Sequence, residues 1–436
     1  MVLIVILFVL NDRIAMQFSI HLKYLDDYQT LVGGGNRLDT AAKPQQSKRR
    51  ALLEVFLVST KLGLTSFGGP IAHLGYFHNE YIQKRKWMDE KSYADLVALC
   101  QFLPGPASSQ VGVGIGTIRA GLLGGAAAWL GFTLPSIILL LLFSLLMKAM
   151  DVSSTGWIHG LKIVAVAIVA QAVLSMGKKL ASDKSTASIA IAAASVTLLW
   201  QTVYSQVVII VLAGLIGLFA FKTVSNQDNS TIRVHVHRSV AIFCLILYAL
   251  LLLLLPIISG LWHSQLLSLF DSFYRVGSLV FGGGHVILPL LEREVVPQGW
   301  VSKEAFLAGY GATQAVPGPL FTFGTYLGAM FAGFKGAFVG TLAIFLPAYL
   351  LIIGALPFWN SLRTNVKIQS AFVGINAAVV GILLAALYNP LWTTAIIHPY
   401  DFALVSVLFG LLVFWKLPPW CIVLLGAVAG EALYYL

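Results

Sequence analysis

Charged residues are scarce in this chain of 436 residues, because only 11% are Asp, Glu, Lys or Arg while 58% are hydrophobic. Typical soluble domains are about 25% charged and about 45–50% apolar. A water-soluble protein of this length needs charge over its surface, and 28 basic plus 18 acidic residues are too few for that. The composition therefore excludes an ordinary soluble enzyme, a nucleic-acid-binding protein and a disordered chain, and it indicates a polytopic membrane protein.

Motifs for soluble chemistry are also missing. The three cysteines, Cys100, Cys244 and Cys421, are far apart in apolar surroundings, so we expect small buried hydrophobic residues rather than a disulfide or metal framework. His235 and His237 have no third ligand nearby, which favours a solvated loop over a metal site. The sequence contains no Walker A, GxGxxG or GxSxG motif. We expect no enzyme activity, no cofactor, no metal site and no ATP hydrolysis on this chain.

Long apolar runs such as 139–146 and 249–255 do not alternate with polar residues, so the spanning elements must be helices and not barrel strands. At about 20 residues for each span, the sequence predicts an all-α fold with about 10–13 membrane segments. The candidate segments are 51–67, 94–120, 121–148, 158–178, 186–204, 206–222, 239–261, 266–283, 304–334, 336–357, 368–388, 400–415 and 418–436.

Two polar stretches flank the membrane segments. Residues 1–50 are expected to form a disordered N-terminal extension, or to reflect a start assigned too early, with Met16 as the true start. Their first ten residues resemble a signal-peptide core, but a basic n-region and a cleavage site are missing. Residues 223–238 are basic and predict a cytoplasmic linker between two units, 51–222 and 239–436.

The two units contain the same motifs in the same order. KLGLTSFGGP at 61–70 recurs as RVGSLVFGGG at 275–284, an offset of 214. Further matches, with one single-residue gap, pair Glu80 with Glu294, Trp87 with Trp300, Gln101 with Gln314, Pro104-Gly105-Pro106 with Pro317-Gly318-Pro319, Gly124 with Gly336 and Pro135 with Pro347. We interpret the chain as a tandem duplication of one membrane unit.

Charge asymmetry favours inverted repeats, which are typical of secondary transporters. The loop after the first FGG motif is rich in Lys and Arg, whereas its counterpart mixes basic with acidic residues, so the two loops are expected on opposite sides of the membrane. Segment 239–261 has no counterpart before Ala51, which also favours inversion. Basic residues 48–50 precede segment 51–67, so this segment either re-enters without crossing or departs from the charge rule.

Glycines and prolines interrupt the apolar segments at corresponding places in both units, and these breaks are the first candidates for substrate contact. A broken helix is tolerated in lipid only where protein or water satisfies its backbone, and its N-terminus suits an anion. The alternative is a packing kink. The residues are Gly68, Gly69, Pro104, Gly105, Pro106, Gly282, Gly283, Pro317, Gly318 and Pro319.

Polar side chains near the breaks complete the candidate site. Lys61 and Arg275 could neutralise an anion, or they could extend to the membrane interface, and Arg119 allows the same two interpretations. The amides of Gln101 and Gln314 could donate to an oxyanion, or they could link helices. The hydroxyls of Ser108, Ser109 and Thr322 have the same two options. Candidates for carrying a coupled proton are Glu80, Glu294, His73 and His285.

Three glycine pairs at small-xxx-small spacing are expected to serve helix packing alone: Gly112/Gly116, Gly336/Gly340 and Gly426/Gly430.

The combination of SFGGPIAH (66–73), Glu80 with Lys86-Trp87, QFLPGP (101–106), VFGGGH (280–285) and QAVPGP (314–319) resembles the chromate ion transporter family in its long, two-domain form. The likeness covers residues 51–436 and leaves out the N-terminal extension. It implies a multi-pass carrier of the bacterial inner membrane that expels chromate and confers resistance, with sulfate as a related anion. Pro70 stands where the second unit has Gly284, so the units are expected to have specialised.

Residues and resemblance together predict a secondary transporter for chromate, driven by membrane potential, protons or anion exchange. The alternatives are an importer of sulfate or another oxyanion, and an anion channel. The expected partners are chromate, sulfate as a competitor and the lipid bilayer, but no nucleic acid. A homodimer is left open.

Overall fold

All regular elements described in the structure are helices. The computed structural model describes residues 48–149, 156–200, 202–221, 236–262, 264–281, 283–359 and 366–435, and the predicted all-α fold is confirmed there. Most of the N-terminal extension, most of the 223–238 linker and Gly282 lie outside the described residues. Among the described residues the first helix begins at Lys48: Lys and Arg are good helix formers, and residues 48–50 continue into the apolar helix.

The helices before the linker are α3 (Lys48–Thr65), α4 (Gly69–Phe77), η2 (His78–Lys84), α5 (Glu90–Phe102), α6 (Ala107–Ala149), α7 (Gly156–Leu180), α8 (Lys184–Leu199) and α9 (Val203–Ala220). After it come α10 (Arg238–Leu261), α11 (Gln265–Leu279), η4 (Gly284–Val286), α12 (Ile287–Val295), α13 (Lys303–Thr313), η5 (Leu320–Thr322), α14 (Phe323–Ala355), η6 (Leu356–Phe358), α16 (Val366–Ala386), η7 (Leu387–Trp392), α17 (Thr393–Ala395), α18 (Pro399–Val413) and α19 (Pro419–Tyr434).

The order of helices follows the internal repeat. By position, α3 corresponds to α11, α5 to α13, α6 to α14, α7 to α16, α8 to α18 and α9 to α19. Below, α3–α9 are called the first repeat and α11–α19 the second repeat. Helix α10 has no counterpart among the described helices of the first repeat.

The two longest helices, α6 and α14, are hairpins. Backbone angles leave the helical region at Ala120 and Gly121 in α6, and α14 turns in the same way at Ala332 and Gly333. After the turn in α6 the chain folds back so closely that the backbone of Gly124 touches Gly116. The first limb of α6 has 13 residues and is about 20 Å long. It is shorter than the ~30 Å hydrocarbon layer and reaches only part of the way through it.

Two predicted membrane segments, 94–120 and 304–334, each contain a helix break. The Pro-Gly-Pro motif ends α5 or α13 before the next helix begins, as predicted for this motif. Proline lacks a backbone donor and restricts the residue before it, so a helix ends there. The predicted boundary between residues 120 and 121 coincides with the turn in α6.

The described helices include five stretches that are long and apolar enough to cross a membrane. They are Ala107–Ala149, Gly156–Leu180, Arg238–Leu261, Leu320–Phe358 and Val366–Ala395, and four shorter apolar helices accompany them. Many large apolar side chains on these helices are exposed, for example Leu142 and Phe243. Exposed apolar side chains suit a surface in lipid, and the chain is a multi-pass membrane protein.

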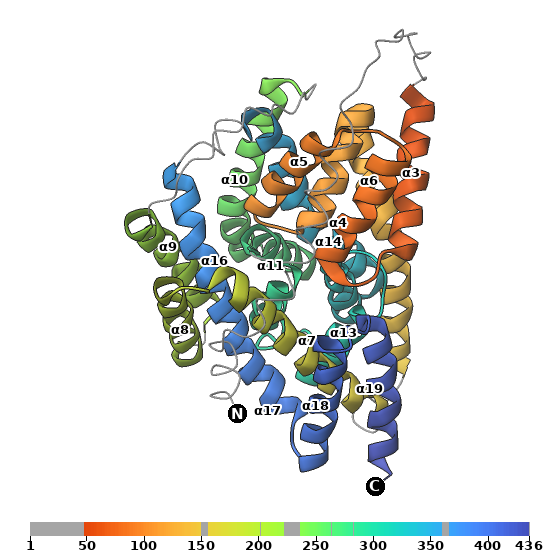
Figure 1. Cartoon of the computed structure of the whole chain (residues 1–436), viewed down its shortest axis with the longest axis vertical. Coiled ribbons are helices and arrows are strands. Elements are labelled where there is room, and N and C mark those ends of the chain that lie inside the picture. The colour runs from red at the N-terminus through yellow and green to blue at the C-terminus, as the bar shows by residue number, and fades with distance from the viewer. Residues whose placement is uncertain are drawn as a thin grey trace, which may run out of the picture. The chain divides into compact units, whose positions relative to one another are not determined.

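The repeats exchange helices with each other. Helix α7 of the first repeat packs against α18 and α19 of the second, and α16 of the second packs against α8 and α9 of the first (Figure 1). Such reciprocal packing relates the repeats by an approximate two-fold axis. In Figure 1, α5 lies in the upper part of the view and α13 in the lower part, which agrees with repeats of opposite orientation.

Small residues allow this exchange. Gly426 and Gly430 of α19 face the backbone of Gly160 in α7, and Gly336 faces the backbone of Gly328 inside the α14 hairpin. The prediction of small-xxx-small packing is confirmed for these glycines. Cys100 and Cys244 are buried and free as expected, whereas Cys421, near the start of α19, is only partly buried.

Candidate functional site

The Gly-Gly motif of each repeat meets the Pro-Gly-Pro motif of the other. Gly105 donates its backbone N–H to the Val280 carbonyl at 2.7 Å, and Gly318 donates to the Ser66 carbonyl at 2.9 Å. Ser66 and Val280 are equivalent positions of the repeat, as are Gly105 and Gly318. The two hydrogen bonds are therefore reciprocal and bring the four helix breaks to one place, called below the crossing.

The residues after the Gly-Gly motifs also meet at the crossing. A Cβ on Gly284 would lie 3.5 Å from Cγ of Pro70, and these two residues occupy equivalent positions of the repeat. Equivalent residues touch only near the axis that relates the repeats. The Pro/Gly difference between the two motifs thus lies where the repeats come together.

Two glycines at the crossing are required by geometry. Gly105 has φ +115° and a Cβ there would lie 3.0 Å from Cβ of Ala348. Gly318 has φ +103°, and its Cβ would lie 2.8 Å from Oγ of Ser136. A side chain at either place would meet both backbone strain and a clash.

Other residues predicted at the breaks vary in exposure. The prolines on both sides of Gly105 and Gly318 are buried. In contrast, Gly68 is exposed, and Gly69 and Gly283 are half-buried, so the Gly-Gly side of the crossing is open. Gly68 and Gly69 adopt positive φ of 95° and 79° and start α4.

The first limb of α6 presents its N-terminus to the crossing. The helix begins at Ala107, directly after Pro106, and Gln110 is the first residue of the limb whose N–H donates to a preceding carbonyl, that of Pro106 at 3.0 Å. The first N–H groups of a helix lack intrahelical partners and form the positive end of its dipole. An anion at the crossing would be stabilised by this end of α6.

Buried polar side chains of the first repeat gather around this N-terminus. We call them the first-repeat polar set: Ser66, His73, Ser108, Ser109 and Gln110, each 3% exposed or less. His73 Nδ1 lies 3.3 Å from Ser108 Oγ, and Gln110 Nε2 donates to the Pro104 carbonyl at 2.9 Å.

Four atoms of this set have no hydrogen-bond partner among the described residues. They are Ser66 Oγ, His73 Nε2, Ser109 Oγ and Gln110 Oε1. Leaving a buried polar group unpaired costs about 1–3 kcal/mol, so several together need an explanation such as a bound polar ligand or water.

The second repeat has mostly apolar residues at the equivalent positions. Ser66, His73, Ser108 and Gln110 correspond to Val280, Ile287, Phe321 and Phe323. Thr322 corresponds to Ser109, but its hydroxyl donates to the Pro319 carbonyl at 2.6 Å. At these positions the crossing is therefore polar on the side of the first repeat and mostly apolar on the other.

The two predicted glutamines do not share one environment. Gln101 is exposed on the last turn of α5, whereas Gln314 is buried and its Nε2 has no partner among the described residues. The buried amide at the first Pro-Gly-Pro motif belongs to Gln110, which sequence reasoning missed. Its signal was an isolated amide in the apolar, Gly-rich run that follows Pro106.

The two histidines differ as well. His285 lies in η4 and its Nδ1 is 2.8 Å from the Tyr310 hydroxyl, whereas His73 contacts Ser108 and packs edge-on against Phe132. They are not equivalent by sequence and do not occupy equivalent places.

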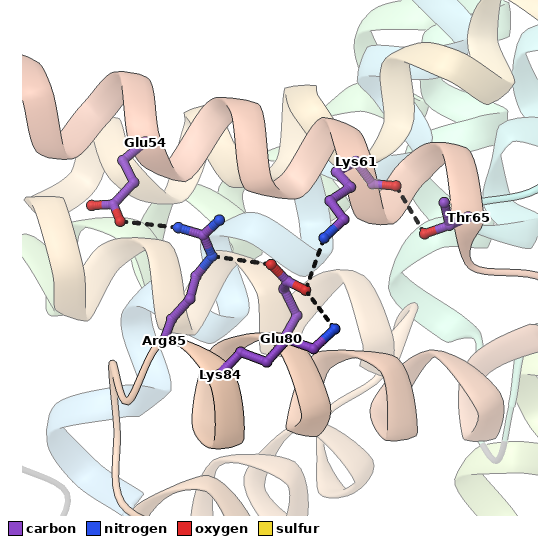
Figure 2. A network of polar contacts seen from close by, with 6 residues as sticks. All are labelled: Glu54, Lys61, Thr65, Glu80, Lys84 and Arg85. Atoms are coloured by element: carbon purple, nitrogen blue, oxygen red, sulfur yellow. Dashed lines mark hydrogen bonds and ion pairs between the residues drawn. The ribbon is translucent and has the colours of Figure 1, made fainter.

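Lys61 of α3 belongs to a cluster of charged side chains with Glu80, Lys84 and Arg85 (Figure 2). Its Nζ lies 3.2 Å from Glu80, which Arg85 and Lys84 also approach, at 3.1 and 3.5 Å. Arg85 in turn contacts Glu54 at 3.1 Å. Burial disfavours the Glu80 carboxylate, but hydrogen bonds from Arg85 and Lys61 outweigh this and hold its pKa below the usual range. The charge of Lys61 is thus matched by a carboxylate.

Arg275 has the same kind of partner in the second repeat. Its Nη2 lies 3.0 Å from Glu294 and 3.4 Å from Asp271. Since Lys61 corresponds to Arg275 and Glu80 to Glu294, one cation–glutamate pair is retained in both repeats.

Arg119 lies away from the crossing. It is near the far end of the first limb of α6, twelve residues after Ala107, which is about 18 Å along a helix. Its Nη2 contacts Glu54 at 3.2 Å, and its guanidinium lies over the Trp87 ring. Of its two interpretations, this placement favours the interfacial one.

Broken helices from two repeats that meet at a polar helix N-terminus are typical of membrane transporters. The sequence model of the family described as chromate transporter matches residues 53–218 and 267–431, one match in each repeat. The chain belongs to the chromate transporter family.

Named relatives agree with this assignment. The chain is 27% identical to a chromate transport protein of Pseudomonas aeruginosa over 78% of its own length and 82% of the relative. It is 28% identical to a probable chromate transport protein of Synechococcus elongatus, over 87% and 94%. An uncharacterized transporter of Methanocaldococcus jannaschii is 26% identical over 80% and 87%. No solved structure matches the chain.

Proposed function

We propose that this protein is a secondary transporter that moves chromate across the membrane and binds it at the crossing. The pair of reciprocal hydrogen bonds, Gly105 to Val280 and Gly318 to Ser66, is the observation that supports this most. It joins the breaks of both repeats beside the N-terminus of α6 and the first-repeat polar set. The relatives named chromate transport proteins support chromate as the substrate.

Chromate is a tetrahedral dianion whose oxygens accept hydrogen bonds, so its site must supply donors. The candidates are the N–H groups in the first turn of α6, the hydroxyls of Ser66 and Ser109, His73 Nε2 when it carries a proton, and the Gln314 amide. All of them are neutral when His73 is neutral. Because Lys61 and Arg275 already face carboxylates, we propose that these neutral donors contact the anion and that the cation–glutamate pairs hold the neighbouring helices.

Physical driving forces favour efflux for such a substrate. A membrane potential that is negative inside drives two negative charges outward with about 4.6 kcal/mol per 100 mV. We therefore propose efflux from the cytoplasm across a bacterial inner membrane, giving chromate resistance. Membrane potential is the first candidate for the energy source, with protons or anion exchange as additions. An importer of sulfate would work against this potential and would need a coupled ion.

Membrane vesicles of opposite orientation test the proposal. Labelled chromate should accumulate in everted vesicles that contain the protein, and should not accumulate in right-side-out vesicles or in vesicles without the protein. Collapsing the potential with an ionophore should reduce the accumulation. Accumulation only in right-side-out vesicles would indicate import, and flux that neither saturates nor shows counterflow would indicate a channel. No chromate flux in either orientation would refute the proposed function.

A further inference from the structure

A cluster in the second repeat places two buried carboxylates on one guanidinium. Asp271 and Arg275 are one turn apart on α11, and Glu294 reaches the same Nη2 from α12. Asp271 is 7% exposed and Glu294 is 3% exposed. With both carboxylates ionised this cluster carries one net negative charge in a buried place, which is unfavourable unless a proton or another cation joins it.

The corresponding cluster in the first repeat has more cations than carboxylates around the equivalent glutamate position. Glu80 is surrounded by Lys61, Lys84 and Arg85, so its carboxylate has cations in excess. The position of Asp271 is taken by Leu57 in the first repeat. The retained pair thus has additional positive charge in the first repeat and additional negative charge in the second, where two carboxylates contact one cation.

The side chains in contact with Asp271 and Arg275 from outside the cluster are two neutral hydroxyls. On α10, Ser259 Oγ lies 3.3 Å from Asp271, and on α11, Ser272 Oγ lies 3.4 Å from Arg275. Next to Glu294 on α12 stands Glu292, which interacts with Arg293 and with Lys303 of α13. The guanidinium of Arg293 is itself held by the carbonyls of Thr197 and Thr202 and by Ser205 Oγ on the first repeat.

A small cavity gives the cluster room for water. Its volume is about 20 Å³, and Arg275, Glu294, Arg293 and Gln206 of α9 contribute to its lining. That volume is enough for one water molecule, which could deliver a proton to the carboxylates. The Nε atom of Arg275 is buried and has no hydrogen-bond partner among the described residues.

Electrostatic surroundings agree with a protonatable pair. Helices α11 and α12 lie outside the five spanning candidates. Burial raises the pKa of Asp271, against the opposing effect of Arg275. Burial likewise raises the pKa of Glu294, with Arg275 opposing and the Asp271 charge adding to the increase. The pKa of Glu80 in the first repeat shifts in the opposite direction.

We infer that Asp271 and Glu294 share one proton, and that a chromate anion bound at the crossing increases their affinity for it, so that anion and proton bind together. The anion and the proton together carry one net negative charge, which a potential that is negative inside still drives outward. Arg275 precedes Val280 of the crossing by five residues, about 8 Å along a helix, which is within reach of a dianion's field. The proton passes from water to a carboxylate oxygen and no bond to the anion forms. This inference rests on the proposed function, because it needs an anion at the crossing.

Proton uptake by the purified full-length protein tests the coupling. Chromate is added to the protein in weak buffer containing a pH-indicator dye, and bound chromate is measured in parallel. The native protein should take up about one proton per chromate, and its Kd for chromate should rise about tenfold per pH unit above the pKa of the pair. Asp271→Asn and Glu294→Gln should each abolish the uptake, since either leaves Arg275 with one carboxylate. Glu304→Gln, an exposed glutamate on α13, is the matched control and should retain it.

Infrared spectroscopy separates failure of this inference from failure of the proposed function. A carboxylic-acid band should grow when chromate is added to the native protein and be missing from both cluster variants. Chromate binding without proton uptake and without this band would overturn the coupling and leave the proposed function in place. If chromate did not bind at all, the function and the coupling would both fall, and a pH titration of the band in anion-free protein would still decide whether the pair shares a proton.

Discussion

Gly318 of the second repeat donates its backbone N–H to the carbonyl of Ser66 in the first, at 2.9 Å, and so ties one Pro-Gly-Pro motif to the opposite Gly-Gly motif. The equivalent bond from Gly105 to Val280 ties the other pair. In both bonds the donor is a buried glycine with positive φ. The joint between the repeats thus depends on backbone atoms that no side chain can replace.

Replacing Gly318 by alanine should abolish transport. The new Cβ would lie 2.8 Å from Ser136 Oγ, and the left-handed backbone would add about 1–2 kcal/mol of strain. Relief of both would move the N–H away from Ser66. The measurement is chromate flux in vesicles at matched protein content. Gly299→Ala is the control, because Gly299 has φ +69° and no atom within 4 Å of a Cβ. Equal flux in the two variants would contradict the prediction.

Exchanging first-repeat polar residues for their second-repeat counterparts should preserve the fold and remove the function. Ser66→Val takes away a buried hydroxyl that has no partner among the described residues, so stability should stay the same or rise by about 1 kcal/mol. His73→Ile removes an unpaired Nε2 but also the contact of Nδ1 with Ser108, so its stability should stay within about 1 kcal/mol of the native protein. Chromate flux should fall at least tenfold, because a donor to the anion is lost. Thermal unfolding in detergent and vesicle flux measure the two effects.

Ser144→Ala is the matched control for this exchange. Ser144 is also buried, but its hydroxyl donates to the Leu141 carbonyl of its own helix. Its removal should leave chromate flux unchanged. Flux retained in both Ser66→Val and His73→Ile would remove the first-repeat polar set from the site.

Replacing Arg275 should lower the free energy of unfolding more than replacing Lys61. Arg275→Ala leaves Asp271 and Glu294 buried and uncompensated, and loss of one partner from a buried charged pair costs about 3–5 kcal/mol. Lys61→Ala leaves Glu80 with two other cations, and a pair whose lysine is 57% exposed contributes at most about 1 kcal/mol.

The pH dependence of this difference follows from the carboxylates. Without Arg275 they can become neutral only by taking up protons, so the instability of Arg275→Ala should be largest at high pH and shrink as the pH falls. Thermal unfolding of both variants across pH measures this. A larger loss of stability in Lys61→Ala at high pH would contradict the charge balance described here.

The sequence predicted the helix breaks but not the contacts between the breaks of the two repeats. Gly and Pro at fixed places in both repeats identified Gly68, Gly105 and Gly318 as helix interruptions, because the chemistry of a break is local. That Gly318 bonds to Ser66 is a long-range relation between the repeats, and no local pattern encodes it. In α6 the predicted boundary between residues 120 and 121 coincides with the turn, but the close packing of the two limbs, Gly116 against Gly124, was not predicted.

The sequence also did not predict which side chains contact each other. Lys61 and Arg275 were recognised as unusual charges, but their nearest neighbours, Glu80 and Glu294, are 19 residues further along the chain and reach them only through tertiary packing. Gln110 was missed and Gln101 preferred, because spacing relative to the prolines does not reveal which amide turns inward. A charged or amide side chain in an apolar segment is a candidate for a structural or functional role. Which role it has depends on the side chains that pack against it.

Sulfate should compete with chromate for transport. The two are tetrahedral dianions of similar size, and the donors at the crossing are backbone N–H groups and short polar side chains rather than a group that distinguishes the central atom. A site of this kind does not strongly reject an isostere. Chromate flux should therefore fall several-fold when sulfate is in large excess. The test uses labelled chromate and the reconstituted protein, with gluconate at equal ionic strength as the control anion. If excess sulfate left chromate flux at the gluconate level, the crossing would need a contact specific to chromate, and the neutral-donor site proposed here would be wrong.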